Sequence, residues 1–460
     1  MQNRGVHEHD VRHGDESGDS RSDFSAPRCS QLLKLEVLFR FADQDLFTIA
    51  DAYYMLHSDS QTVIARCREL AAISEIADCT LRTFLSPEMK RCYETVGQWM
   101  RDAGMAVSID AGGNLRGVRP GREPGKRVFL LGSHLDTVRD AGAFDGILGV
   151  VLGIAIVEKF TGQVLPFDIQ VIGFSEEEGV RFGFPFIGSQ ALVGSLDEET
   201  LNRVDSAGVT VAEAIREFGI TANIWEAKLG TRPLGFIEFH IEQGPVLDKA
   251  GESVAVVAAI VGQTRASVKF VGSANHAGTT PMTLRRDAMA AASEWISAVE
   301  RVAVNTDGLV ATTGKLEVHP NQVNVIPGEV TVWLDVRHAD DKARQSACVV
   351  LRRLASQMTD RRELKLFWED VLDQKAVRMD DSLTRVLESA SPAGIRQMVS
   401  GAGHDAMILA PHMPTAMLFL RSPGGVSHHP TENVLPEDVD LALGIGVRCI
   451  ESMKVEYNLA

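Results

Sequence analysis

The chain has 460 residues, of which 45% are hydrophobic and 23% charged, and its formal net charge is −16. These values are typical of a globular protein, and the length predicts two or three domains. The negative charge disfavours nucleic acid as a partner, because nucleic-acid-binding proteins normally present a basic face. The apolar runs stay below the ~20 residues that a membrane helix needs. We therefore expect neither a nucleic-acid partner nor a membrane partner.

The first 60 residues differ in composition from the rest of the chain. Residues 1–30 are polar and residues 31–55 are more apolar, so we expect residues 1–60 to form an extension that is partly disordered. The sequence shows no signal peptide, and its six cysteines form no CxxC pair. Both features are typical of reduced thiols in a cytosolic protein. The sequence therefore predicts a cytoplasmic location.

Strand-like and helix-like segments alternate from residue 61 to residue 251. Apolar runs such as RVFLLGSH, FDIQVIGFS and GFIEFHIEQG stand between segments with helical periodicity. This alternation predicts an α/β domain in which a mixed, largely parallel sheet is flanked by helices. Residues 376–460 resume the same style with the strand-like run TAMLFL. We expect residues 61–251 and 376–460 to form one main domain.

Residues 252–375 follow another pattern. Strand-like runs alternate with two long amphipathic segments in an order typical of a small α+β domain, with helices on one face of an antiparallel sheet. We therefore predict that this smaller domain interrupts the main one.

Histidine and acidic residues stand where the predicted parallel strands end. His134 ends one strand, Glu176–Glu178 follow the next, His240 ends a third, and His428 lies in the loop after a fourth. Asp145 lies in the loop that leaves the first strand. Because the carboxyl ends of parallel strands meet at one edge of a sheet, these side chains should converge. Gathered carboxylates and imidazoles destabilise one another unless a cation joins them.

Three histidines, one aspartate and one glutamate exceed the three protein ligands of an ordinary catalytic zinc. They fit two divalent ions that share a carboxylate and a water molecule. A further glutamate that binds no ion can move a proton from this water to a leaving nitrogen. The pattern indicates hydrolysis of an amide-like C–N bond, which makes the main domain the catalytic domain.

Over about residues 65–455 the chain resembles the dinuclear-metal amidohydrolases related to aminoacylase and bacterial di- and tripeptidases. Within them it resembles the branch of allantoate amidohydrolase, N-carbamoyl-L-amino-acid hydrolase and β-ureidopropionase. The resemblance implies a zinc-peptidase-like catalytic domain and a ferredoxin-like domain that serves as a lid and a dimerisation surface. The motifs that carry it are GSHLDTV, AGAFDG, FSEEEGVRFG, HIEQGPVL, IVGQTR, NHAGTTPMTLRRDA, NQVNVIPGEV, LDVRH, SGAGHDA and GGVSHHPTENV.

The resemblance implies a role for individual residues of the catalytic domain. Glu177 would be the general base, and Asp136 would orient the imidazole of His134. Asp145 would bridge the two ions. The five metal ligands would be His134, Asp145, Glu178, His240 and His428.

The inserted domain would complete the site. The resemblance implies that His276 reaches the active site of a neighbouring subunit in a homodimer and stabilises the oxyanion. Asn324 and Arg337 would hold the substrate carboxylate, since an arginine fork beside an amide donor suits that planar group. Gln263 would add a further polar contact.

The substrate implied is a small ureido carboxylate. Two stretches, LRTFLSPEM and MLFLRSPGGVSHHP, resemble the allantoate-hydrolysing members of the branch, which implies conversion of allantoate to ureidoglycine, ammonia and carbon dioxide. An N-carbamoyl-L-amino-acid hydrolase or a β-ureidopropionase is the alternative. An aminoacylase, a peptidase or a non-catalytic binding protein on the same fold is a more distant one. The resemblance implies Mn²⁺, although nitrogen and oxygen ligands also accept Zn²⁺, Co²⁺ or Ni²⁺.

Overall fold

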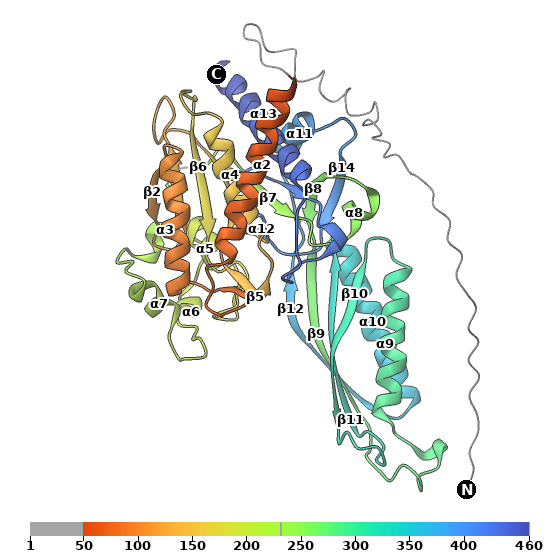
Figure 1. The fold of residues 1–460 in the computed structure, drawn as a ribbon. Coiled ribbons are helices and arrows are strands. Elements are labelled where there is room, and N and C mark those ends of the chain that lie inside the picture. Colours follow the sequence, from red (N-terminus) through yellow and green to blue (C-terminus); the bar gives the residue numbers. More distant parts are fainter. Residues whose placement is uncertain (1–48, 231, 460) are drawn as a thin grey trace, which may run out of the picture. The chain divides into compact units, whose positions relative to one another are not determined.

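The computed structural model describes residues 49–230 and 232–459 (Figure 1). The chain divides into two compact units, Met1–Met55 and Leu56–Ala460. Only residues 49–55 of the first unit are described, and they are helical. The disorder predicted for the beginning of the chain therefore falls outside the described residues. Among the described residues, no helix is both long and apolar enough to cross a membrane.

A nine-stranded mixed sheet forms the centre of the second unit. Four neighbouring strands, β15, β7, β4 and β6, run parallel to one another. Their carboxyl ends therefore share one edge of the sheet, as the sequence predicts. In order across the sheet the strands are β13 (Val377–Arg378), β8 (Val254–Ile260), β15 (Thr415–Leu420), β7 (Gly235–Ile241), β4 (Val128–His134), β6 (Asp168–Phe174), β3 (Leu115–Arg119) and β2 (Ala106–Ile109), with β14 (Arg396–Ser400) beside β8.

Helices cover both faces of this sheet. One face packs against α4 (Ile147–Glu158), α11 (Asp381–Ala390) and α13 (Pro436–Leu459), and the other against α5 (Ile187–Val193) and α12 (Asp405–Leu409). Alternate residues of each central strand enter the two cores. In β7, Ile237 and Phe239 face α4, whereas Phe236 faces the opposite core. Because side chains alternate along a strand, Glu238 and His240 point to the same face as Phe236.

Local sequence explains the elements that support the site. Ser86 accepts a hydrogen bond from the backbone N–H of Met89, and Pro87 begins α3 (Pro87–Asp102). Helix α4 has eleven consecutive buried residues, because it lies between the sheet and other helices.

The remaining elements outside the small sheet are α2 (Ile49–Ala71), α6 (Glu198–Leu201), α7 (Val211–Glu217), α8 (Val246–Ala250), the short strands β1 (Thr80–Arg82) and β5 (Thr137–Ala141), and the 3₁₀ turns η2 (Ile224–Ala227) and η4 (Pro423–Gly425).

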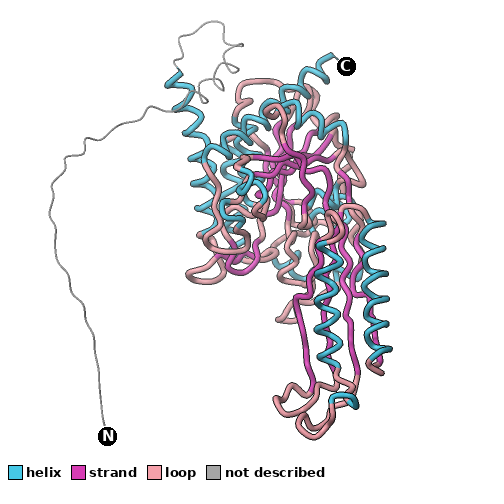
Figure 2. Tube along the Cα trace, turned by 90° about the vertical axis from the view of Figure 1, so that its right-hand side faces the viewer, coloured by secondary structure: helices cyan, strands magenta, loops and turns pink. Residues whose placement is uncertain are grey.

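A separate four-stranded antiparallel sheet has a core of its own. Its strands, in order, are β10 (Val310–His319), β11 (Glu329–His338), β9 (Gly262–Val271) and β12 (Lys365–Gln374). Helices α9 (Ala288–Val304) and α10 (Asp341–Arg361) pack on one face, and Figure 2 shows them running alongside the strands. The turn η3 (Met282–Leu284) lies between β9 and α9.

The predicted α/β class, with a main mixed sheet and a smaller antiparallel one, is confirmed. One segment differs from the sequence-based assignment. Strand β8 was expected in the smaller domain, but it pairs with β15, β14 and β13 in the large sheet. A run such as VAVVAAI is suited to any strand that is buried on both faces, so its composition does not indicate which sheet it joins. The smaller sheet begins at Gly262.

Candidate metal centre

The four parallel strands bring the predicted metal ligands together at one edge of the sheet. His134 is the last residue of β4, and His240 is the penultimate residue of β7. Glu177 and Glu178 follow β6, and His428 lies in the loop after β15. These groups come from segments almost 300 residues apart, so only the parallel pairing of the strands places them side by side.

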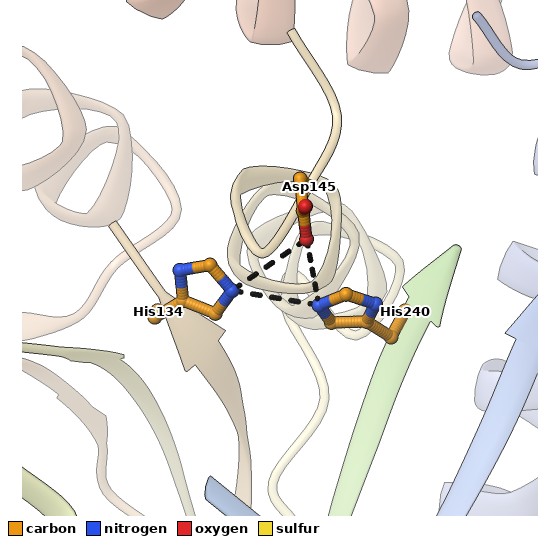
Figure 3. A group of neighbouring side chains, drawn as sticks. All are labelled: His134, Asp145 and His240. Atoms are coloured by element: carbon orange, nitrogen blue, oxygen red, sulfur yellow. Dashed lines mark hydrogen bonds and ion pairs between the residues drawn. The ribbon is translucent and has the colours of Figure 1, made fainter. Parts of the chain in front are cut away.

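Asp145 lies between two groups of ligands. Its Oδ1 is 3.2 Å from His240 Nε2 and 3.8 Å from His134 Nε2, and the two imidazole nitrogens are 3.5 Å apart (Figure 3). Its Oδ2 is 3.1 Å from His428 Nε2, which is itself 3.6 Å from Glu178 Oε1. Each group offers three donor atoms within 4.8 Å of one another. Asp145 thus contributes a different oxygen to each group, which is the arrangement of a bridging carboxylate.

The donor set fits two divalent cations. Asp145 Oδ1 is buried and makes no hydrogen bond of acceptable geometry, although two imidazole nitrogens lie nearby. An oxygen in that situation is costly unless a cation satisfies it. Gly146 leaves room for the His134 imidazole, because a Cβ at this position would lie 2.3 Å from His134 Nε2. Imidazole and carboxylate ligands suit Mn²⁺, Zn²⁺, Co²⁺ and Ni²⁺ alike.

The ionisable groups of the centre change one another's pKa values. Burial alone would raise the pKa of Asp145, but contacts with His240 and His428 outweigh it and hold this pKa well below its ordinary value. Burial opposes protonation of His240, yet Asp145 raises its pKa to about 9. The contact with Asp145 also raises the pKa of His428 to about 9. Burial and the nearby charge of Asp145 raise the pKa of Glu178 to about 7.

The structure distinguishes the three consecutive glutamates. Glu176 turns away from the histidines, and its buried carboxylate accepts hydrogen bonds from the backbone N–H groups of Phe84, Arg181 and Phe182. Glu177 and Glu178 instead each bring a carboxylate oxygen within 4.8 Å of a His134 nitrogen. Glu176 therefore anchors the loop, while the two glutamates that follow it face the centre.

Asp136 holds this loop in place. Its Oδ1 accepts a hydrogen bond from Glu177 N at 3.1 Å and its Oδ2 from Glu178 N at 3.0 Å. His134 Nδ1 lies 3.0 Å from the backbone oxygen of Asp136 and 3.7 Å from its carboxylate. The imidazole is thus held by the backbone carbonyl rather than by the predicted carboxylate contact. This bond leaves His134 Nε2 directed at Asp145.

The four predicted substrate-binding residues lie at two ends of the small sheet. Gln263 and Arg337 are paired neighbours where β9 begins and β11 ends. His276 and Asn324 lie in loops beyond the opposite end, where Ala277 N donates to the Asn324 carbonyl. Ten-residue strands span about 30 Å. The two pairs therefore do not meet within one chain.

Each pair has defined contacts. Arg337 pairs with Asp335 and donates from Nη1 to the Gly401 carbonyl at 2.7 Å, which links the small sheet to the loop before α12. His276 Nδ1 accepts hydrogen bonds from the backbone N–H groups of Gly278 and Thr279. The imidazole must therefore carry its proton on Nε2, where it can donate to a ligand.

Three features of the centre were not identified from the sequence. Gln243 donates from Nε2 to Asp145 Oδ2 at 2.9 Å. Glu432 accepts hydrogen bonds from the backbone N–H groups of Phe144 and Asp145. The ring of His404 lies edge-on to His240, with centroids 4.4 Å apart. These three residues lie in the motifs HIEQGPVL, GGVSHHPTENV and SGAGHDA, and their presence in these motifs is the sequence signal that could have identified them.

Two ligand groups that share one carboxylate, at the carboxyl edge of an α/β sheet, could hold two divalent ions, as the centres of two-ion hydrolases do. Residues 130–452 match the model of peptidase family M20/M25/M40, and the chain belongs to this family.

Two curated relatives and one solved structure illustrate the similarity. The chain is 37% identical over 417 residues to an allantoate deiminase of Arabidopsis thaliana, covering 82% of this chain and 79% of the relative. It is 38% identical over 369 residues to an N-carbamoyl-L-amino acid amidohydrolase of Geobacillus stearothermophilus, covering 78% and 89%. A hydantoinase/carbamoylase-family amidase structure from Burkholderia multivorans superposes with a TM-score of 0.81 at 31% identity, covering 85% and 97%.

Proposed function

We propose that this chain hydrolyses a ureido C–N bond of allantoate to give ureidoglycine, ammonia and carbon dioxide. The observation that carries the proposal is the position of Asp145, whose two oxygens lie beside two different sets of nitrogen and oxygen donors. The likeness to an allantoate deiminase over most of both chains supports the choice of substrate.

His134, Asp145 and His240 would hold one ion, and Asp145, Glu178 and His428 the other. When bound, such a pair lowers the pKa of a shared water and polarises the scissile carbonyl. We propose Mn²⁺ as the physiological metal, following the resemblance of the motifs. Ion analysis of the purified protein, by mass spectrometry of the bound metal, tests this choice.

Glu177 would be the general base. Burial and the neighbouring carboxylates of Glu178 and Asp405 raise its pKa well above the ordinary value. A carboxylate with a raised pKa is suited to accept a proton from the attacking water and to deliver it to the leaving nitrogen. Asp136 would act as a positioning residue, because it fixes the backbone N–H groups of both glutamates.

Gln263 and Arg337 would bind the substrate carboxylate from within the same chain. Arg337 Nε and Nη2 are engaged by Asp335 and its Nη1 by the Gly401 carbonyl, and these contacts restrict the motion of the guanidinium. An arginine restricted in this way can recognise a planar carboxylate with little further loss of entropy.

We further propose that the protein is a homodimer formed through the small sheet. His276 and Asn324 lie about 30 Å along the sheet from Arg337, so they would serve the site of a second copy. Large apolar side chains are exposed on this part of the chain, as expected of a surface that a partner covers. They include Met282, Leu284, Val310, Leu316 and Val323.

Subunit mixing tests the shared site. Glu177→Gln and His276→Ala variants, each inactive alone, should recover about a quarter of wild-type activity when mixed, because half of the dimers are mixed and each holds one intact site. Native mass spectrometry confirms the exchange of subunits. If exchange occurs and activity stays absent, His276 acts within its own chain.

An N-carbamoyl-L-amino-acid hydrolase is the second candidate, favoured by the 38% identity to the enzyme of Geobacillus stearothermophilus. Rates on allantoate, N-carbamoyl-L-amino acids and N-carbamoyl-β-alanine, measured side by side, decide between the candidates. Higher kcat/KM on allantoate supports the proposal, and turnover of a carbamoyl compound alone overturns the choice of substrate. The cytoplasmic location also stays a prediction, which cell fractionation tests.

A further inference from the structure

Arg82 is a fully buried arginine next to the loop that carries His134. Its side-chain hydrogen bonds go to backbone carbonyls, and none goes to a carboxylate of a described residue. Nε donates to the Leu135 carbonyl at 2.9 Å, and Nη1 donates to the carbonyls of Leu70 at 2.7 Å and Ile73 at 3.0 Å. Nη2 has no hydrogen-bond partner among the described residues. Because arginine stays protonated, a buried guanidinium without a carboxylate is costly to the fold.

The three carbonyls belong to two separate parts of the chain. Leu70 lies in the last turn of α2, and carbonyls at the carboxyl end of a helix carry partial negative charge that stabilises a cation. Leu135 instead follows β4 and lies between His134 and Asp136. The guanidinium therefore joins the end of α2 to the loop of the candidate metal centre.

Arg82 contacts the residues on both sides of Asp136. Its Nε bonds to the carbonyl of Leu135, and its backbone N–H donates to Thr137 Oγ1 at 2.9 Å. The Asp136 carbonyl holds Nδ1 of His134, and the Asp136 carboxylate holds two backbone N–H groups of the glutamate loop. The Leu135 carbonyl belongs to the peptide group that leads into Asp136. A rotation of this peptide group would therefore move both the carbonyl and the carboxylate of Asp136.

The residues that follow Arg82 also contact the glutamate loop. The N–H of the buried Phe84 donates to Glu176 Oε2 at 3.2 Å, and the Phe84 carbonyl accepts a hydrogen bond from Arg181 Nη1 at 2.7 Å. Residues 82–84 thus contact both the loop after β4 and the loop after β6. Each of these loops lies directly beside predicted metal ligands.

We propose that Arg82 is a positioning residue of the metal centre. Through the Leu135 carbonyl it fixes Asp136, and Asp136 in turn fixes the direction of the His134 imidazole and the place of Glu177. Arg82 itself contacts neither an ion nor the substrate. This inference rests on the proposed function, because it concerns the same centre. Residues that orient metal ligands in this way change metal affinity or activity by about 10- to 100-fold when they are replaced.

The test uses Arg82→Met, which removes the donors, and Arg82→Lys, which keeps the charge but lacks the planar fork that reaches separate carbonyls. Calorimetric titration of metal-stripped protein with Mn²⁺ is carried out at a temperature where melting curves show each variant folded. The Kd for Mn²⁺ should rise about 10- to 100-fold in both variants. Arg82→Lys keeps the test decisive if Arg82→Met does not fold.

Steady-state kinetics on allantoate at saturating Mn²⁺ give a second measurement. Because Glu177 would be misplaced, kcat should fall about tenfold or more. KM should change by less than about twofold, since the proposed carboxylate contacts of Gln263 and Arg337 come from the small sheet.

Tyr93→Phe is the matched control. Tyr93 is buried in the same core, and its hydroxyl donates to the Gly113 carbonyl at 2.7 Å rather than to residues 134–137. This variant should lower the melting temperature and leave Kd and kcat unchanged.

Two results would overturn the inference. Arg82 variants with a lowered melting temperature but the Kd and kcat of the wild type would make Arg82 only an anchor for α2. Equal losses in Tyr93→Phe would show that any destabilisation of this core loosens the centre. Failure of the proposed function appears separately, as absence of allantoate turnover by the wild type, and the Kd values for Mn²⁺ still decide the role of Arg82.

Discussion

Loading the metal-stripped protein with divalent ions at pH 7.5 should release about two protons per chain. His240 and His428, each with a pKa of about 9, are almost fully protonated at that pH. Glu178, with a pKa of about 7, is about one quarter protonated. All three groups must lose their protons to bind a cation. Two histidines of ordinary pKa would together release only about 0.2 protons.

Calorimetric titration with Mn²⁺ in two buffers of different ionisation enthalpy measures this release directly. His428→Gln should reduce it by about one proton. Because protons leave as the ions bind, raising the pH must strengthen binding, by up to about 100-fold per pH unit between pH 7 and 8. Release of less than half a proton, or affinity that falls as the pH rises, would show that Asp145 does not raise the pKa of both imidazoles.

Three further predictions concern single groups. Glu177→Gln should lower kcat at least about 100-fold with bound metal retained, and near-normal turnover would exclude it as the base. Arg337→Met should raise KM for allantoate about tenfold or more and change kcat less, whereas unchanged KM would remove Arg337 from the substrate site. The melting temperature of metal-stripped protein should fall as pH rises from 6.5 to 9. The raised pKa of His240 stabilises the folded state below pH 6.5, and this stabilisation is lost as the pH rises through 9. Calorimetric melting curves that are flat or rise over this range would contradict the raised pKa of His240.

The sequence predicts the fold class and the location of the centre because both depend on repeated local patterns. The buried runs ending at His134 and His240 are readable as strands of a parallel sheet. The rule that ligands gather at the carboxyl edge then selects the same residues that the structure brings together.

Contacts between segments that are distant in the sequence could not be predicted from local patterns. Glu432 supports the Asp145 loop from 287 residues away, and no local pattern pairs the two. The three consecutive glutamates are chemically identical, and only the turn at Glu176, with its φ of 51°, decides which of them face the histidines. The distance between Arg337 and His276 depends on strand register, which alternation alone does not give.

The most direct test of the two-ion account is a Mn²⁺ titration of chelator-stripped protein, followed by ammonia release from allantoate. We predict no turnover without metal and an activity that saturates at two bound ions per chain. Turnover by the stripped protein, or full activity with a single ion bound, would contradict the bridging role of Asp145.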